Sequence, residues 1–103
     1  LDQRLSRELE LVLYRVAQEA LTNIARHSQA KTAQVSLRQV AGRVTLSIVD
    51  DGAGFDAEAV LAHPSGLGLA GMRERLALVG GSLQVQSTPG QGTVLIASAP
   101  ATA

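Results

Sequence analysis

The first part of the chain has apolar residues at intervals of three and four positions, from about Glu8 to His27. Because a helix has about 3.6 residues per turn, this spacing places the apolar residues on one side of it. The set consists of Leu9, Val12, Leu13, Val16, Ala17, Ala20, Leu21 and Ile24. The pattern therefore predicts an amphipathic helix over residues 8–27, packed on a core through this stripe.

A different pattern follows, in which apolar and polar residues alternate over residues 33–37 and 43–48. Side chains along a strand point to opposite faces in turn, so the alternation places the apolar residues on one face. These residues are Ala33, Val35 and Leu37 in the first segment and Val44, Leu46 and Ile48 in the second. With Ala41-Gly42 between them, the two segments predict an antiparallel hairpin with one covered face.

The second half of the chain repeats this order of a helix and two strands. Helical spacing over residues 69–79 points four apolar residues inward, and Gly80-Gly81 provides the stop. The inward residues are Leu69, Met72, Leu76 and Val79. Strands are expected at 82–87 and 93–99, around a Pro89-Gly90 turn. The order predicts an α+β fold of two layers, with the helices on one face of a mostly antiparallel sheet.

The two halves are joined by a segment rich in glycine and small polar residues. It begins with Asp50-Asp51-Gly52-Ala53-Gly54, which ends the second strand because glycine relaxes the steric limits on the backbone. Within the loop that follows, one helical turn is expected near residues 57–61.

Composition limits the size and the surroundings of this fold. A chain of 103 residues with 46% hydrophobic residues can build one domain with one core. It has no cysteine, which excludes disulfides and thiolate metal sites and fits the cytoplasm as the expected compartment. No apolar run approaches the roughly 18 residues of a membrane span. The first ten residues do not have the basic and apolar regions of a signal peptide, and the sequence does not begin with Met, so we expect residues 1–103 to be a single domain of a longer protein.

The charges are balanced, with nine basic and nine acidic residues, and only 2% of the residues are aromatic. Surfaces that bind nucleic acid or anionic membranes usually carry a basic excess, and nucleic-acid sites often add aromatic residues for stacking. The composition therefore argues against nucleic acid as a partner and against direct membrane contact by this domain.

A G-x-G-x-x-G motif, formed by Gly66, Gly68 and Gly71, opens the second predicted helix. A dinucleotide site needs a strand directly before the glycines and an acidic residue about 20 positions later, and no Asp or Glu follows Glu74. A P-loop needs Gly-Lys-Ser/Thr, which the single lysine, Lys31, does not provide. Two interpretations stay open for the motif alone: backbone N–H groups that hold an anion at the helix N-terminus, or glycines that only form a turn.

The first predicted helix carries a polar ridge formed by Glu19, Asn23 and His27, with Arg26 beside it. Asparagine is a mediocre helix former, yet Asn23 lies well inside the pattern. Carboxylate and amide oxygens suit a hard cation such as Mg²⁺, and Arg26 could meet a phosphate. The alternative is a solvated helix face, which is favoured when Glu19 and Asn23 are taken alone.

Taken together, four segments resemble the ATP-binding catalytic domain of sensor histidine kinases. The segments read, in order, QEALTNIARH, DDGAGF, GLGLAGMRERL and GQGTVLIASAP. They are most similar to the nitrate-sensor and desaturase-thermosensor type within the superfamily of gyrase, heat-shock chaperone, histidine kinase and mismatch-repair ATPases. The resemblance runs from about Leu9 to Pro100. It implies the α/β sandwich called the Bergerat fold, with a mixed, mostly antiparallel sheet.

The resemblance also implies roles for the polar ridge. Asn23 would coordinate a Mg²⁺ ion that bridges the phosphates of ATP. Glu19 would be the catalytic residue that positions a water molecule or supports the metal. Arg26 and His27 would lie near the phosphates and the ribose.

The two glycine-rich segments would complete the nucleotide site. The resemblance implies that Asp50, followed by Gly52 and Gly54, accepts a hydrogen bond from the amino group of adenine. Guanine has a carbonyl at this edge, which a carboxylate would repel, so ATP should be preferred over GTP. The backbone of Gly66 and Gly68 would meet the phosphates.

Other positions near these motifs have less definite roles. Thr93 matches the threonine that closes the adenine side, and the segment from Phe55 to Gly66 matches a lid over ATP. Asp51 is interpreted as a turn residue and Met72 as core. For Arg73 and Arg75, phosphate contact and a solvated surface charge both stay open, and at least one of the two is expected to be solvated.

As a whole, the resemblance implies a protein-histidine kinase domain that uses ATP and Mg²⁺. The γ-phosphoryl group would pass to a histidine on a separate dimerisation domain of the same kinase, which serves a response regulator. Alone, the fragment is expected not to autophosphorylate, and the longer protein could be membrane-anchored. The alternatives are an anti-sigma-factor-type serine kinase, a binding module of the same superfamily, or an α+β interaction module without nucleotide affinity.

Overall fold

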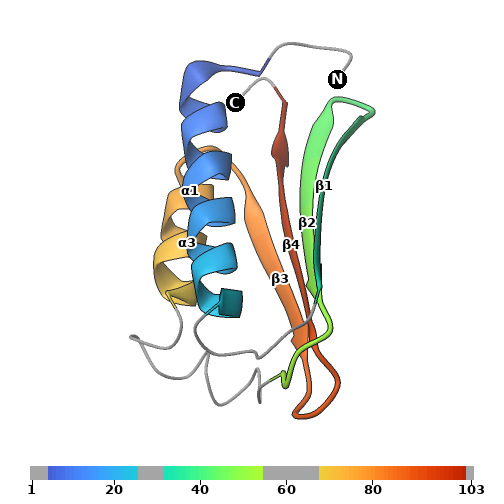
Figure 1. Cartoon of the computed structure of the whole chain (residues 1–103). Helices are drawn as coiled ribbons and strands as arrows, with labels where there is room; N and C mark the ends of the chain where they lie inside the picture. Colours follow the sequence, from blue (N-terminus) through green and yellow to red (C-terminus); the bar gives the residue numbers. More distant parts are fainter. Residues whose placement is uncertain (1–4, 26–31, 55–67, 102–103) are drawn as a thin grey trace.

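The computed structural model describes residues 5–25, 32–54 and 68–101. In Figure 1 the described helices lie side by side on one face of a sheet. The elements are α1 (Arg7–Asn23), β1 (Ala33–Val40), β2 (Arg43–Asp50), α3 (Leu69–Ala77), β3 (Ser82–Ser87) and β4 (Thr93–Pro100). The predicted two-layer α+β fold is confirmed.

The four described strands lie in the order β1-β2-β4-β3. All three pairings are antiparallel, and β4 pairs with both β2 and β3. Strand β4 therefore joins the first hairpin to the second one. Residues directly opposite each other in such pairings point to the same face of the sheet.

The helix-facing side of the sheet is built in rows that cross the strands. One row contains Val35, Ile48, Leu95 and Val85, and the next contains Leu37, Leu46, Ala97 and Leu83. Helix α1 covers β2 and β4, while α3 covers β3 and β4. The core lies between these rows and the apolar stripes of the two helices.

Helix α1 begins with a side-chain cap. The Ser6 hydroxyl accepts a hydrogen bond from the Leu9 N–H at 3.1 Å, and two glutamates in the first turn face the positive end of the helix dipole. The stripe that packs on the sheet is Leu9, Val12, Leu13, Val16 and Ala20. The α-helix ends at Asn23, and residues 24–25 continue in a wider, π-type turn. The remainder of the predicted helix, residues 26–27, lies outside the described residues.

Helix α3 is also amphipathic, and it buries Leu69, Met72 and Leu76 as predicted. It ends at Ala77, two residues earlier than expected, because the chain turns back and the Gly81 N–H bonds to the Leu76 carbonyl at 2.7 Å. Among the described residues, neither helix is long and apolar enough to cross a membrane. The helical turn expected near residues 57–61 lies outside the described part.

The prediction that the whole first hairpin has a covered face is wrong for its first strand. In β2, the side chains of Val44, Leu46 and Ile48 are buried as expected. In β1, Val35 is 49% exposed and Leu37 is 43% exposed, although both point to the same face. The reason is position, because β1 is an edge strand and the helices pack over the other three strands.

This difference predicts unequal stability effects at two leucines that lie directly opposite each other. Leu46 is 4% exposed and Leu37 is 43% exposed. Leu46→Ala should lower the free energy of unfolding by about 2–5 kcal/mol, because it leaves a cavity under the helices. Leu37→Ala should lower it by only about 1 kcal/mol. Urea denaturation followed by circular dichroism measures both values, and equal losses would contradict the uncovered position of β1.

Candidate functional site

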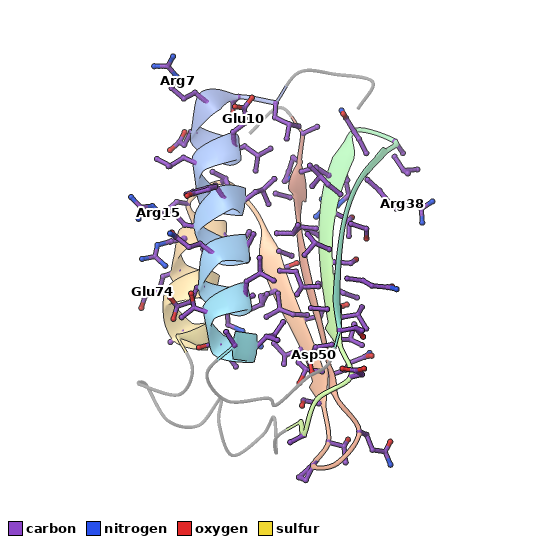
Figure 2. The ribbon with its side chains drawn as sticks, in the orientation of Figure 1. Arg7, Glu10, Arg15, Arg38, Asp50 and Glu74 are labelled. Carbon is purple, nitrogen blue, oxygen red and sulfur yellow. The ribbon has the colours of Figure 1, made fainter. Side chains whose placement is uncertain are left out.

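Four elements bring their ends together at one end of the molecule. Figure 1 shows the last turn of α1, the end of β2, the start of α3 and the start of β4 at the lower end of the view. These ends carry Asn23, Asp50, Gly68 and Thr93. Figure 2 labels Asp50 at this same end. Residues that are far apart in the sequence are thus collected there.

At this end of the molecule, the apolar rows that cross the sheet are followed by a row of polar side chains. Asp50 lies directly opposite Thr93, and Thr93 lies directly opposite Ser87. The next row inward is apolar, with Ile48, Leu95 and Val85. We call Asp50, Thr93 and Ser87 the polar row. The polar row places hydrogen-bonding side chains at the end of the apolar core, beside the ends of the helices.

Asp50 is only 8% exposed, and its carboxylate is held in one orientation. The Gly52 N–H donates a hydrogen bond of 2.7 Å to Asp50 Oδ1 and closes a tight turn. Burial of a carboxylate is costly unless it accepts hydrogen bonds, and a carboxylate offers about four acceptor positions. One bond to the backbone therefore leaves acceptor capacity for a ligand that brings an N–H group.

The glycines after Asp50 have a packing role that their sequence does not reveal. Gly54 has a positive φ of 67°, and a Cβ there would overlap the Thr88 carbonyl and lie 2.9 Å from the Gly92 carbonyl. The Gly90 N–H also bonds to the Ala53 carbonyl. The loop after β2 is thus pressed against the turn between β3 and β4, which supports the ends of both strands of the polar row.

The ridge of α1 meets the glycine motif of α3 directly. A Cβ on Gly68 would lie 2.5 Å from Glu19 Oε1, and Gly68 has a positive φ of 73°. The carboxylate of Glu19 therefore lies against the backbone at the N-terminus of α3, where the helix dipole favours negative charge. Asn23 follows Glu19 by four residues, so it lies on the same ridge one turn closer to the end of α1.

The donor set at this end fits magnesium held mainly by a bound ligand. The protein oxygens are the Glu19 carboxylate and the Asn23 amide, both hard donors of the kind Mg²⁺ prefers. Over residues 5–25, 32–54 and 68–101, no group of three or more His, Cys, Asp or Glu side chains could hold a metal ion. A metal here would thus have few protein ligands and would need phosphate oxygens and water.

Several predicted site residues cannot be compared with this geometry. Arg26, His27, Gly66 and the lid segment from Phe55 to Gly66 lie outside the described residues. Around them, the prediction that Met72 belongs to the core is confirmed, since Met72 is fully buried. Arg73 and Arg75 are both exposed on α3.

Asp51 has a partner that its interpretation as a turn residue did not include. Its Oδ1 accepts a hydrogen bond from the Thr32 N–H, and its Oδ2 accepts one from the Thr32 hydroxyl, each at 3.0 Å. The Asp51 N–H also bonds to the Thr32 carbonyl at 3.4 Å. These bonds extend the pairing of β1 with β2 by one residue beyond Asp50. The only sequence signal was an aspartate placed directly after a strand.

A separate hollow lies on α1, away from the polar row. It has a volume of about 450 Å³ and is lined by Tyr14, Ala17, Gln18, Leu21, Thr22 and Ala25. None of the predicted site residues lines it. The chemistry indicated by Asp50, Glu19 and Asn23 therefore belongs to the end of the molecule, and the hollow on α1 is a different feature.

The packing of the loop after β2 predicts a large cost for one glycine substitution. Gly54→Ala should lower the free energy of unfolding by about 3 kcal/mol or more, because backbone strain adds to steric overlap. Gly90→Ala is the matched control, since Gly90 also has a positive φ, of 83°, but open space around its Cβ. That control should lose only about 1–2 kcal/mol. Thermal unfolding measures both, and equal losses would contradict the close approach at Gly54.

Comparison with known proteins identifies relatives of the whole described fold. A family model described as "Histidine kinase-, DNA gyrase B-, and HSP90-like ATPase" matches residues 8–103. The sensor histidine kinase ComP of Bacillus subtilis is 37% identical over 83 residues, covering 81% of this chain and 11% of ComP. The histidine-protein kinase/phosphatase DegS of the same organism is 38% identical over 100 residues, covering 96% of this chain and 26% of DegS. The chain thus spans about a quarter or less of these relatives.

Solved structures show the same architecture. The histidine kinase AdeS of Acinetobacter baumannii matches with a TM-score of 0.72 and 26% identity, over 94% of this chain and 47% of that one. The ATP binding domain of PrrB from Mycobacterium tuberculosis matches with a TM-score of 0.67 and 24% identity, over 93% of this chain and 68% of that one. Together with the family match over residues 8–103, these similarities show that the chain belongs to the histidine kinase-, DNA gyrase B- and HSP90-like ATPase family, in its histidine kinase branch.

Proposed function

We propose that this domain binds Mg·ATP at the end where α1, β2, α3 and β4 meet, and that it donates the γ-phosphoryl group to a histidine of a separate dimerisation domain. The observation that carries the proposal is the nearly buried carboxylate of Asp50, held by the Gly52 N–H and facing the helix layer. A buried acceptor of this kind serves a ligand that donates a hydrogen bond in a partly desolvated site.

Adenine is the base that fits Asp50. Its amino group donates a hydrogen bond, and a charged acceptor makes this bond stronger than a neutral one would be. Guanine and hypoxanthine carry a carbonyl at the same position, whose oxygen would face the carboxylate without a hydrogen between them. The domain should therefore prefer ATP to GTP. Gly52 contributes by fixing the direction of the carboxylate through its N–H.

The phosphates of ATP would fit at the N-terminus of α3, across the site from Asp50 and the adenine. Gly68 exposes backbone at the helix N-terminus, where the dipole favours an anion. The Glu19 carboxylate lies against the same backbone, so a triphosphate placed there would face a second negative charge. The Asn23 amide would hold a Mg²⁺ ion there together with the phosphate oxygens, and bound Mg²⁺ supplies the charge neutralisation that phosphoryl transfer needs.

The phosphoryl acceptor would come from another domain. In phosphoryl transfer the protein mainly positions the reactants and stabilises charge, so a domain of this kind needs only to hold ATP and present its γ-phosphate. Glu19 would orient the attacking group or a water molecule next to the phosphates. The relatives in sequence and structure are described as histidine kinases, which supports a histidine acceptor and a response regulator further on.

Asp50→Asn tests the adenine assignment. The variant keeps the shape of the side chain but loses its charge and one acceptor atom, a loss of about 1.5–3 kcal/mol for a charge-assisted bond. The affinity for Mg·ATP should fall about 10- to 150-fold. Asp51→Asn is the matched control, because it removes a neighbouring charge that bonds to Thr32, and its affinity should stay near wild type. Isothermal titration calorimetry measures both variants, and an unchanged affinity for Asp50→Asn would refute the assignment.

Asn23→Ala tests the metal assignment in a separate titration. Removal of the amide should weaken ATP binding about tenfold in the presence of Mg²⁺, since one ligand of the ion is lost. Binding of ATP in EDTA should change little. Gln18→Ala, on the exposed side of α1, is the control for general effects on the helix. A loss of the same size with and without Mg²⁺ would show that Asn23 contacts the nucleotide rather than the metal.

A further inference from the structure

The N-terminus of α3 has no capping group of its own. Its N-cap residue, Gly68, makes no side-chain hydrogen bond, and the first turn of the helix contains no acidic residue. Helix α1 differs, because the Ser6 hydroxyl caps it and Glu8 and Glu10 lie in its first turn. The backbone N–H groups that begin a helix need acceptors and attract negative charge. At α3 this charge has to come from another part of the chain.

Glu19 of α1 supplies that charge. A Cβ on Gly68 would lie 2.5 Å from Glu19 Oε1 and 3.0 Å from the carboxyl carbon of Glu19, so the carboxyl group lies against the N-cap residue. Glu19 is half-buried in this position. The dipole of α3 therefore acts on a carboxylate of the protein that is in place before any ligand arrives.

The same position is the one proposed for the phosphates of ATP. A phosphate at the N-terminus of α3 would meet the Glu19 carboxylate at close range, and like charges repel each other most where water is partly excluded. Asp50 adds a second carboxylate at this end of the molecule. Free ATP is a polyanion and would face both acidic side chains. A divalent cation on its phosphates would offset most of the charge that Glu19 opposes.

We propose that Glu19 is a specificity residue that makes the site accept ATP together with a divalent cation and reject free ATP. The inference rests on the proposed binding of Mg·ATP, and it adds the form of the nucleotide that the site selects. The Glu19 carboxylate and the phosphates compete for the N-terminus of α3 unless a cation compensates for both. Glu19 thus acts through its charge, whereas Asn23 acts through the amide oxygen proposed as a metal ligand.

Three roles of Glu19 differ in their effect on affinity. If Glu19 excludes free ATP, Glu19→Gln should tighten the binding of ATP in EDTA, because the amide keeps the size of the side chain and loses its charge. If Glu19 only bound the metal, the variant would weaken binding in Mg²⁺ and leave binding in EDTA unchanged. If it only supported α3, the variant would weaken both. The sign of the change in EDTA therefore separates the three roles.

The test is a calorimetric titration of the wild type and Glu19→Gln with ATP, in Mg²⁺ and in EDTA. Glu19→Gln should lower the dissociation constant in EDTA about three- to tenfold, the effect of removing one partly screened charge at close range. Added salt should reduce this gain, because ions screen the repulsion that the variant removes. An unchanged or weaker affinity in EDTA, or a gain that does not depend on salt, would overturn the proposal.

Glu10→Gln is the matched control variant. It removes the same charge from α1, but Figure 2 shows Glu10 at the end of the molecule away from Asp50. Its affinity for ATP should equal that of the wild type in Mg²⁺ and in EDTA. Adenosine is the control ligand, since it has the base and the ribose without phosphates, and Glu19→Gln should not change its affinity. Tighter binding in either control would show a general effect and overturn the proposal.

Circular dichroism verifies that the variants fold. If Glu19→Gln does not fold, Glu19→Asp replaces it, because a shorter side chain draws the charge back from Gly68 and should give a smaller gain in EDTA. The absence of any gain in Glu19→Asp would then count against the proposal.

The wild-type protein separates this inference from the function on which it rests. A wild type that binds ATP neither in Mg²⁺ nor in EDTA would refute the proposed ATP site, and the role of Glu19 would fall with it. A wild type that binds ATP more tightly in Mg²⁺ than in EDTA, with the same ratio in Glu19→Gln, would refute the role of Glu19 alone.

Discussion

The register between β2 and β4 is the constraint on which the rest of the structure depends. It places Asp50 opposite Thr93 and, two residues further along the pairing, keeps Ile48 and Leu95 under the helices. A slip of one residue would turn every side chain of one strand to the other face. The same pairing therefore buries the core and aligns the polar row, so the stability and the site of this domain cannot be varied independently.

Close approach of backbone segments is the second condition for the site. Gly68 allows the carboxylate of Glu19 to reach the N-terminus of α3, and Gly54 allows the loop after β2 to reach the turn before β4. In both places the absence of a side chain brings together parts of the chain that are far apart in sequence. These glycines, which the sequence motifs assign to ligand contact, are packing residues in the structure, so a substitution there would disturb the fold that supports the proposed site.

The distribution of charge separates the outer surfaces of the helices from the end of the molecule that carries the polar row. Figure 2 shows Arg15 and Glu74 on the outer sides of the helices, pointing away from the sheet, whereas Asp50 lies at the end where the elements converge. Asp50 is the one charged residue buried among those the structure describes. Its burial is tolerated because the Gly52 N–H bonds to it, and it leaves the inner face with a single strong acceptor next to two hydroxyl groups.

The sequence by itself determined the local elements and the family, because helical and strand spacing, glycine breaks and the motif order are all properties of neighbouring residues. The α+β class, the stripe of α1 and the burial of Met72 follow from it. It could not determine which strand lies at an edge, since Val35 and Ile48 have the same alternation but only long-range pairing decides which of them the helices cover. For the same reason only the tertiary structure placed Ser87 beside Thr93 and Thr32 beside Asp51, because hydrogen-bond partners across strands depend on register and not on spacing along the chain.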